Sequence, residues 1–548
     1  MLLFYEIRQL LVKLQKEMNN KKIQVWLPLL FSLVMIMGMF FGYKLRDNMG
    51  FNRKGFFASE KITPVQEIIN LINARYVDSV GIDTMGTKAI NELLSQLDPH
   101  SLYIPNQDLK TVNEELDGNF EGIGIEFDIF NDTVNVLNVM PNGPSDKAGI
   151  QIGDRMIKIN DSLIAGVNIT SDKMKKLLRG EVGSKVNTTL LRGKEEKKIT
   201  IERGIIPVNT VDAAYIIQPT VGYIKLNKFT RKSYVEFMEA LEKLQKQGMK
   251  KMILDLRGNG GGILEDAVQI SDEFLDDNKL IVYTQGAHAD KIEYKAKRPG
   301  LFEEGKVAVL VDEFSASASE VVAGALQDWD RATIVGRRSF GKGLVQEPFS
   351  LSDGSQLRLT IARYYTPIGR NIQKPYNKGL RLYSDEVYNR YHNGELVAAD
   401  SNKINNGKAY KTKGGRTVYG GGGIMPDIFV PFDTGNFSKT VSMLYDKRTV
   451  YGFIYRYFIQ NINSLKSFKS PSEFEKSFTV DDKVWKSFTD FAASDSISLN
   501  NISIKDKQIL SQRIKSYLAQ QIWRRQGYFE VSNFHDDVVL KALEALQK

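Results

Sequence analysis

The sequence predicts a multidomain α/β protein that combines an α/β core with a smaller, mainly β domain. From residue 207 to about 432, strand patterns such as Val221–Phe229 and Lys306–Phe314 alternate with helical patterns such as Val235–Leu244. From about 113 to 206, short alternating strands are separated by glycine turns instead. Alternation of strands and helices is typical of a sheet whose loops at the strand ends form functional sites.

Composition is that of a globular protein and excludes several kinds of site. The chain has 548 residues, 42% hydrophobic and 25% charged, with no Cys and four His residues. The lack of Cys excludes a disulfide scaffold, a Cys nucleophile and a thiolate metal site, and the scattered histidines form no HExxH pair. We therefore expect no metal and no cofactor. The net charge of +9 is interspersed with acids, as in Lys194–Lys198, so we expect a solvated surface and no nucleic-acid binding.

An uncharged, apolar run from Ile23 to Tyr43 predicts a transmembrane signal anchor. Twenty-one residues at helical rise span about 30 Å, the thickness of a bilayer core. No cleavage site of small residues follows the run, so we expect the anchor to be retained. Lys21 and Lys22 precede it, which favours a cytoplasmic N-terminus and export of the rest. Met18 also begins a normal signal segment, so the first 17 residues are either a short cytoplasmic helix or lie ahead of the true start.

The segment after the anchor is predicted to be a tether followed by two helices. Residues 44–58 are polar, and apolar residues then recur at helical spacing over Val65–Ile72 and Ala89–Leu97. His100 lies in the next turn, after Pro99. We expect a structural rather than a catalytic role for it.

The β domain resembles a PDZ domain. Its sequence begins with EGIGIEFDIF at Glu121–Phe130, and the stretch AGIQIGDRMIKIND, at Ala148–Asp161, is fairly specific for that family. Taken alone, the GIG turn is simply a hairpin turn. The resemblance implies instead that its backbone N–H groups hold the terminal carboxylate of a peptide, which adds as a strand to the sheet edge. The residues implied in peptide binding are Gly122, Ile123, Gly124 and Ile125.

Two glycine-rich loops come close to nucleotide sites but miss their requirements. Leu256–Gly262 (LRGNGGG) follows a strand, but Ile263 stands where GxGxxG needs its last glycine. Gly336–Gly343 (GRRSFGKG) satisfies GxxxxGK, but Gly343 replaces the Ser or Thr that binds magnesium, and no helical pattern follows. Glycines at a strand end have another use, which is to expose backbone N–H groups to a developing oxyanion.

Ser317 and Lys342 offer a nucleophile and a general base. Ser317 stands where a strand turns into the predicted helix Ser319–Trp329, and Ser317-x-x-Glu320 fits a capping box, so a helix cap is the simpler interpretation of that stretch alone. The free N–H groups of a helix start also stabilise an anionic nucleophile. Lys342 can act as a base only if it is desolvated and its pKa is lowered; the alternative is a surface lysine in a turn.

Together these motifs resemble the carboxyl-terminal processing proteases, also called tail-specific proteases. The resemblance runs from about residue 60 to 432. It implies a ClpP/crotonase-like α/β protease core with an inserted PDZ domain, which the predicted N-terminal transmembrane helix precedes and a predicted C-terminal helical region follows. The motifs that carry it, in order, are LDPHS, the PDZ block, DLRGNGGG, FSASASE, VGRRSFGKGLVQ, TPIGRNIQ and GGGIMPDI.

The resemblance implies Ser317 as the nucleophile, Lys342 as the general base and Gln346 as the residue that orients the lysine. The backbone N–H groups of Gly262 and Ala318 would form the oxyanion hole. The implied reaction is peptide-bond hydrolysis through an acyl-enzyme, on proteins selected by their C-termini, in the periplasm of a bacterium whose inner membrane holds the anchor. An adaptor or activator protein and a homo-oligomer are compatible with this role. The alternative function is a non-catalytic PDZ adaptor on a protease-like fold.

Two segments depart from the family pattern. Residues 374–420 form a polar, Lys/Asn/Gly-rich insertion, and the residues after the core contain aromatic-rich helical stretches, for which we expect an assembly or regulatory role. The predicted domains are a cytoplasmic segment (1–22), the anchor (23–43), an N-terminal helical region (58–112), the PDZ domain (113–206), the protease core (207–432) and a C-terminal helical region (433–548).

Overall fold

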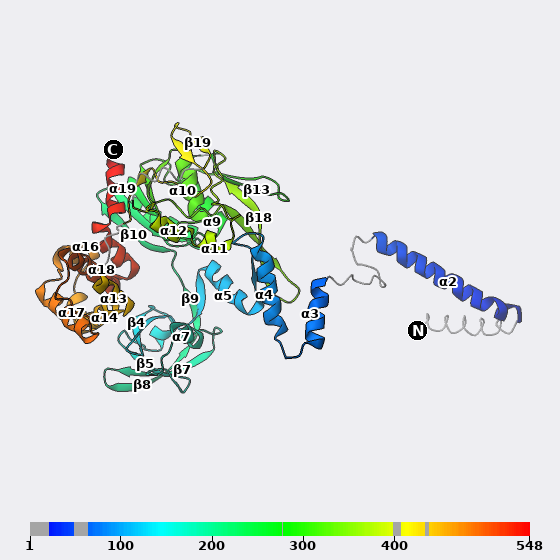
Figure 1. Cartoon of the computed structure of the whole chain (residues 1–548), viewed down its shortest axis with the longest axis horizontal. Helices are drawn as coiled ribbons and strands as arrows, with labels where there is room; N and C mark the ends of the chain where they lie inside the picture. The colour runs from blue at the N-terminus through cyan, green and yellow to red at the C-terminus, as the bar shows by residue number, and fades with distance from the viewer. Residues whose placement is uncertain (1–20, 49–63, 277, 398–406, 433–437) are drawn as a thin grey trace, which may run out of the picture. The chain divides into compact units, whose positions relative to one another are not determined.

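The computed structural model describes residues 21–48, 64–276, 278–397, 407–432 and 438–548, which fall into two units that meet at Met85 and Gly86. The first twenty residues, including the alternative start Met18, lie outside the described residues. In the first unit, α2 (Lys21–Asn48) and α3 (Pro64–Arg75) are helical (Figure 1). None of the helices in the described part of the chain combines the length and hydropathy that a membrane crossing requires.

The second unit is built on a six-stranded sheet with the order β10-β11-β12-β15-β16-β21. β10 and β11 pair antiparallel, and the remaining neighbours are parallel. The carboxyl ends of the parallel strands therefore meet at one edge, where the predicted motif loops follow. The strands are β10 (Val211–Gln218), β11 (Val221–Leu226), β12 (Lys251–Asp255), β15 (Val307–Val311), β16 (Ala332–Gly336) and β21 (Ile428–Phe429).

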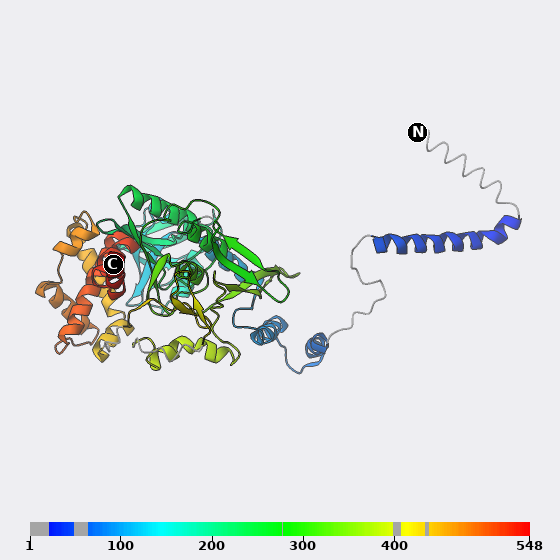
Figure 2. The ribbon, with the colours of Figure 1, turned by 90° about the horizontal axis from the view of Figure 1, so that it is seen from above.

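Helices cover both faces of this sheet. α8 (Ser233–Lys246), α9 (Leu264–Asp272) and α10 (Ala318–Asp328) pack on one face in the largest apolar cluster of the described chain. α19 (Asp537–Gln547) packs on the other face, where Val538, Val539, Ala542, Leu543 and Leu546 meet strand residues such as Tyr223 and Leu310. Figures 1 and 2 both show α19, in red, beside the core. The last helix of the chain thus completes the core.

A second sheet has the order β1-β18-β13-β14, with β17 also paired to β18. β17 begins directly after the FGKG loop, so the stretch predicted not to be a helix is a strand. The strands are β1 (Leu102–Ile104), β13 (Leu280–Gln285), β14 (Ile292–Lys295), β17 (Leu344–Ser350) and β18 (Gln356–Tyr365).

The β domain has its own sheet and core. Its sheet runs β3-β4-β5-β7-β8, with β3 as an edge strand and β6 paired to β5, and β2 (Asn119–Gly122) pairs with β9 (Gly204–Pro207) at the domain's entry and exit. The other elements are β3 (Ile125–Phe130), β4 (Thr133–Val139), α6 (Pro144–Lys147), β5 (Arg155–Ile159), β6 (Ser162–Leu163), α7 (Ser171–Leu178), β7 (Lys185–Arg192) and β8 (Glu195–Glu202).

The predicted C-terminal region divides into two parts. A helical bundle buries aromatic residues such as Phe453, Phe474 and Phe488 in a core of its own, whereas α19 leaves the bundle for the sheet of the core. The bundle contains α13 (Lys439–Asp446), α14 (Thr449–Gln460), α15 (Ile462–Leu465), α16 (Pro471–Ser477), α17 (Asp482–Ser494) and α18 (Ile504–Ser532). The helices of the predicted region 433–548 are therefore divided between this bundle and the core, because the apolar face of α19 is buried against strands.

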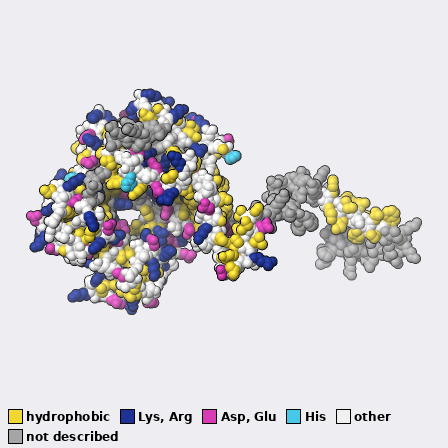
Figure 3. All heavy atoms as spheres, viewed as in Figure 1, with side chains coloured by type: hydrophobic (Ala, Val, Ile, Leu, Met, Phe, Trp, Pro, Cys, Tyr) yellow, Lys and Arg dark blue, Asp and Glu magenta, His cyan; other side chains and the backbone are white. Residues whose placement is uncertain are grey.

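The remaining elements lie around the core. α4 (Ile82–Ser95) and α5 (Asn106–Asp117) precede the β domain, and Figure 3 shows apolar side chains gathered over α3 and α4. The described part of the insertion forms α11 (Leu380–Ser384), α12 (Glu386–His392) and a hairpin of β19 (Ala409–Lys411) and β20 (Thr417–Tyr419).

Candidate active site

Ser317 lies in a strained turn between β15 and α10. Its backbone has φ 56° and ψ −116°, which is outside the helical region although Ala318 begins the helix. A non-glycine residue at positive φ costs on the order of 1–3 kcal/mol, and such residues cluster at functional sites. The Ser317 N–H donates to the Glu320 carboxylate at 2.8 Å, so the predicted capping pair is present. A cap does not require this strain, because a cap residue normally has extended backbone.

Glu320 joins the turn of Ser317 to the loop of Lys342. Its fully buried carboxylate accepts from the backbone N–H groups of Ser317 (2.8 Å), Gly341 (2.7 Å) and Lys342 (2.9 Å), and from the Ser339 hydroxyl. Burial raises the pKa of Glu320, and these hydrogen bonds oppose the rise. The sequence identified this residue only as a helix cap.

Tyr364, on β18, makes a second link between the same two segments. Its hydroxyl lies against the backbone carbonyl oxygens of both Ser317, at 3.1 Å, and Lys342, and can donate to either. Tyr364 therefore links the backbones of Ser317 and Lys342. Ser317 Oγ and Lys342 Nζ are not hydrogen-bonded to each other.

Lys342 is half-buried, and its Nζ has no hydrogen bond or ion pair within the described part of the chain. Burial, with the nearby positive charge of Arg358, lowers the pKa of Lys342 against the opposing charges of Glu320 and Asp98. A lysine on a solvated surface turn would not be desolvated and would keep its usual pKa. Desolvation is the condition under which a lysine amine becomes neutral enough to accept a proton near neutral pH.

Gln346 lies in the same region but contacts a threonine rather than the lysine. A bulge in the pairing of β17 with β18 falls next to it, and its Nε2 donates to Thr360 Oγ1 at 3.3 Å. Thr360 Oγ1 donates in turn to Asp98 at 3.0 Å. Gln346 Oε1 accepts no hydrogen bond from any residue the structure describes.

His100 is half-buried beside the site. Its Nε2 lies 2.8 Å from the hydroxyl of Tyr383, in α11 of the insertion. Burial and the charge of Lys342 lower the pKa of His100 to about 4, so the ring is neutral at physiological pH. Within the described residues, no group of three or more potential metal ligands occurs.

The glycine loop after β12 lies directly against Ser317. A Cβ on Gly261 would come within 2.7 Å of Ser317 Cβ, and one on Gly262 within 1.8 Å of the Phe229 carbonyl oxygen. Both glycines have positive φ (92° and 146°), so no other residue fits. In the described part of the chain, the N–H groups of Gly262 and Ala318 donate to no protein acceptor. The two donors predicted for an oxyanion hole are thus unoccupied.

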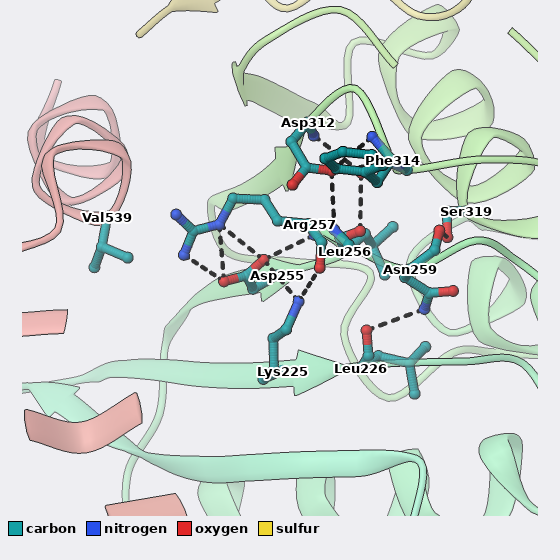
Figure 4. Close-up of polar contacts among 12 residues, drawn as sticks. Lys225, Leu226, Asp255, Leu256, Arg257, Asn259, Asp312, Phe314, Ser319 and Val539 are labelled. Carbon is teal, nitrogen blue, oxygen red and sulfur yellow. Dashed lines mark hydrogen bonds and ion pairs between the residues drawn. The ribbon is translucent and has the colours of Figure 1, made fainter. Parts of the chain in front are cut away.

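Asn259 connects the glycine loop to the turn of Ser317. Its backbone carbonyl accepts from the Ala316 N–H at 3.0 Å and from the Ser319 hydroxyl at 2.8 Å, and its Oδ1 accepts from the Gly261 N–H at 2.9 Å. Its Nδ2 donates to the carbonyl of Leu226 at 3.0 Å (Figure 4). Sequence analysis missed Asn259. Its position between two glycines in the loop was the only signal.

A buried ionic cluster lies at the base of the glycine loop. Asp255 pairs with Arg257 and Lys225, as Figure 4 shows, and Arg257 reaches Asp536, the N-cap of α19, at 2.8 Å. Burial alone would raise the pKa of Asp255, but the two cations outweigh it and hold that pKa well below its usual range. The cluster ties α19 to the strand end from which the glycine loop departs.

The predicted peptide-binding residues of the β domain line a separate cavity. Gly122 ends β2, Ile125 begins the edge strand β3, and the cavity of about 230 Å³ between them has an apolar lining with two cations. The edge of β3 is free to pair within this sheet, as strand addition requires. The other lining residues are Phe120, Ile123, Gly124, Phe127, Lys175, Leu178 and Arg179.

Three segments of the chain match models of known protein families. Residues 220–380 match the model of peptidase family S41, residues 122–202 match that of the PDZ domain, and residues 440–524 match a family of unknown function. Residues 220–380 are therefore similar to peptidase family S41. The S41 region contains Ser317, Lys342 and the glycine loop, and the last match covers the helical bundle and leaves α19 out.

The curated relatives are described as serine proteases. Probable CtpA-like serine proteases are 36% identical over 320 residues in Staphylococcus epidermidis and 35% identical over 322 residues in Staphylococcus aureus, covering 58% of this chain. The match spans 64% of the length of these relatives, less than two thirds. A solved structure of a photosystem II D1 C-terminal processing protease is 25% identical and covers 69% of this chain and 90% of that one, with a TM-score of 0.34.

Proposed function

We propose that this protein is a serine endopeptidase that uses Ser317 as nucleophile and Lys342 as general base. The observation that carries the proposal is the buried Glu320 carboxylate, which holds a strained serine turn and the loop of a desolvated, unpaired lysine together. The S41 match over the same residues supports it. The combination is what an activated nucleophile needs, since the serine hydroxyl is weak without an adjacent neutral base.

The proposed reaction has two halves. Neutral Lys342 takes the proton of the Ser317 hydroxyl while Oγ attacks the carbonyl carbon of the peptide bond, and the resulting oxyanion accepts hydrogen bonds from the N–H groups of Gly262 and Ala318. The leaving amine takes a proton from Lys342 as the C–N bond breaks, which leaves an acyl-enzyme. A water then attacks the ester, with Lys342 again as base, and frees Ser317. Gln346 Oε1 is the acceptor that we propose to orient the Lys342 amine.

We propose that the β domain selects substrates by their C-termini. The support is its PDZ match, the free edge of β3 and the apolar cavity beside the Gly122–Ile125 loop. An apolar terminal side chain would fill the cavity while the terminal carboxylate meets backbone N–H groups of the loop. An activator protein and a homo-oligomer remain predictions.

We also propose that Ile23–Tyr43 anchors the chain in a bacterial inner membrane, with the catalytic part in the periplasm. The support is the uncharged sequence of this run, preceded by Lys21 and Lys22. The test is extraction of cell membranes at alkaline pH, followed by protease treatment of spheroplasts. Release of the full-length chain into the soluble fraction, or protection of its C-terminal part from the protease, would refute this proposal.

The function is tested with an unfolded model protein that ends in a free apolar C-terminus. Wild type should cleave it, and Ser317→Ala and Lys342→Ala should lower the rate by at least about 10³-fold. Lys378→Ala, at an exposed lysine of the insertion, is the control and should leave the rate unchanged. Amidation of the substrate C-terminus should raise KM. Undiminished cleavage by Ser317→Ala would refute the site, and binding of the tail without turnover by wild type would favour the adaptor alternative.

A further inference from the structure

A buried arginine of the insertion donates hydrogen bonds to the backbone of the loop that carries Lys342. Arg390, in α12, is 1% exposed. Its Nη1 donates to the carbonyl oxygens of Arg338 (3.0 Å) and Ser339 (2.8 Å), and its Nη2 donates to that of Phe340 (3.1 Å). Three consecutive carbonyls of the loop therefore depend on one guanidinium from outside the core motifs.

Glu386 holds that guanidinium in place. Its carboxylate lies 2.7 Å from Arg390 Nε, 3.0 Å from Arg338 and 3.1 Å from Lys374. Burial opposes its ionisation, but the three cations lower the pKa of Glu386 to about 2, so it is charged at neutral pH. The Lys374 ammonium also lies over the ring of Phe340, 3.8 Å from its centroid. Arg390 is thus fixed by its ion pair with Glu386, because removing either side chain would leave the other as a buried charge without its partner.

The loop is held from its other side by the core. Glu320 accepts from the N–H groups of Gly341 and Lys342, the two residues that follow Phe340. Arg390 supplies donors for the carbonyls, and Glu320 supplies acceptors for the N–H groups. The path of the backbone into Lys342 is therefore set by both side chains, one of which belongs to the insertion.

We propose that Arg390 is a positioning residue for Lys342, so that the insertion is part of the catalytic machinery. The inference rests on the proposed function of Lys342. Without the three hydrogen bonds, the loop gains freedom and the Lys342 amine moves away from Ser317, and a displacement of about 1 Å can cost about 10²-fold in rate. A looser loop also admits water to the amine, which lets the pKa of Lys342 rise toward that of an ordinary lysine.

The test compares Arg390→Met and Arg390→Lys with Arg381→Ala, a control in α11 whose side chain is 94% exposed. We expect kcat to fall about 10- to 100-fold in Arg390→Met with KM within about twofold, because substrate tails bind in the β domain. The alkaline rise of kcat/KM should move to higher pH, so that the deficit shrinks as pH increases. Arg390→Lys should fall between Met and wild type. An unchanged kcat and pH midpoint would overturn the proposal.

Amide hydrogen exchange makes the test independent of activity. Peptides that cover Ser339–Gly343 should exchange at least tenfold faster in Arg390→Met, and in Arg390→Lys if the first variant does not fold, whereas Arg381→Ala should exchange like wild type. Unchanged exchange in that loop would overturn the inference even if the chain has no peptidase activity. Exchange could instead be faster in Arg390→Met while Ser317→Ala keeps full peptidase activity. That result would refute the proposed function and leave the positioning of the loop by Arg390 established.

Discussion

The covering of the core sheet by α19 leads to a sharp test of how the chain is organised. Leu543 is 5% exposed in the apolar cluster that α19 shares with Tyr223 and Leu310, while Leu540, one turn earlier, is 39% exposed. Truncating a buried leucine to alanine costs roughly 2–5 kcal/mol, from lost transfer free energy and the cavity left behind. A partly exposed leucine such as Leu540 costs less, about 1 kcal/mol or below. Leu543→Ala should therefore destabilise the core strongly and Leu540→Ala barely.

The assay is the temperature at which peptidase activity is lost, because this reports on the core rather than on the helical bundle. About 3 kcal/mol corresponds to a decrease of roughly 6–12 °C for a domain of this size. Leu540→Ala is the matched control and should shift the midpoint by less than about 4 °C. Equal shifts in both variants, or a Leu543→Ala core that loses activity at the wild-type temperature, would refute the argument that α19 is a layer of the protease core.

Two further predictions follow from the site. Lys342→Met should abolish cleavage yet stabilise the fold by about 1 kcal/mol at pH 7, as removal of a strained functional group often does. Because burial lowers the pKa of Lys342, the folded state binds this proton less well than the unfolded chain does, and wild-type stability therefore rises with pH. The stability advantage of Lys342→Met should vanish as pH approaches 10.5, which thermal unfolding from pH 6 to 10.5 would measure. An advantage that is constant over this range would contradict the shift. Gly261→Ala should lower kcat at least about 10²-fold, because its Cβ would meet Ala316 O at 2.6 Å and Ser317 Cβ at 2.7 Å. Gly260→Ala, with open space around its Cβ, is the control and should keep near-wild-type kcat. Equal rates for the two variants would refute the packing of the loop on Ser317.

The parts of the site that local patterns describe could be predicted from the sequence. The strand before the glycine loop and the helix that starts after Ser317 follow from periodicity and turn residues, and both are present. The absence of a helix after Lys342 was also predicted, and a strand lies there. The carboxyl ends of parallel strands share an edge, so the meeting of these loops was also predictable. The exact hydrogen-bond partners of the predicted residues were not predictable. Gln346, for example, donates to Thr360 rather than to Lys342.

The residues that sequence analysis missed act over long separations in the chain. Asn259 contacts a turn about 60 residues away, Arg390 a loop about 50 residues away and Asp536 an arginine 279 residues away. Such polar contacts leave no periodic signal, because a single Asn, Arg or Asp in a loop or helix is normally solvated. The apolar spacing of α19 was visible, but periodicity says only that a helix has a buried face and not which sheet covers it.

The loop over Arg338–Gly343 explains why charged residues were needed at these long-range positions. An irregular backbone that is buried cannot use the ladder of a sheet, and each unsatisfied N–H or C=O group there costs on the order of 1–3 kcal/mol. A carboxylate only accepts hydrogen bonds and a guanidinium only donates them, so Glu320 and Arg390 satisfy opposite groups of the same loop. Apolar packing could not do this. Among the residues that the structure describes, Lys342 Nζ has no hydrogen-bond or ion-pair partner, and a free amine is what its proposed chemistry requires.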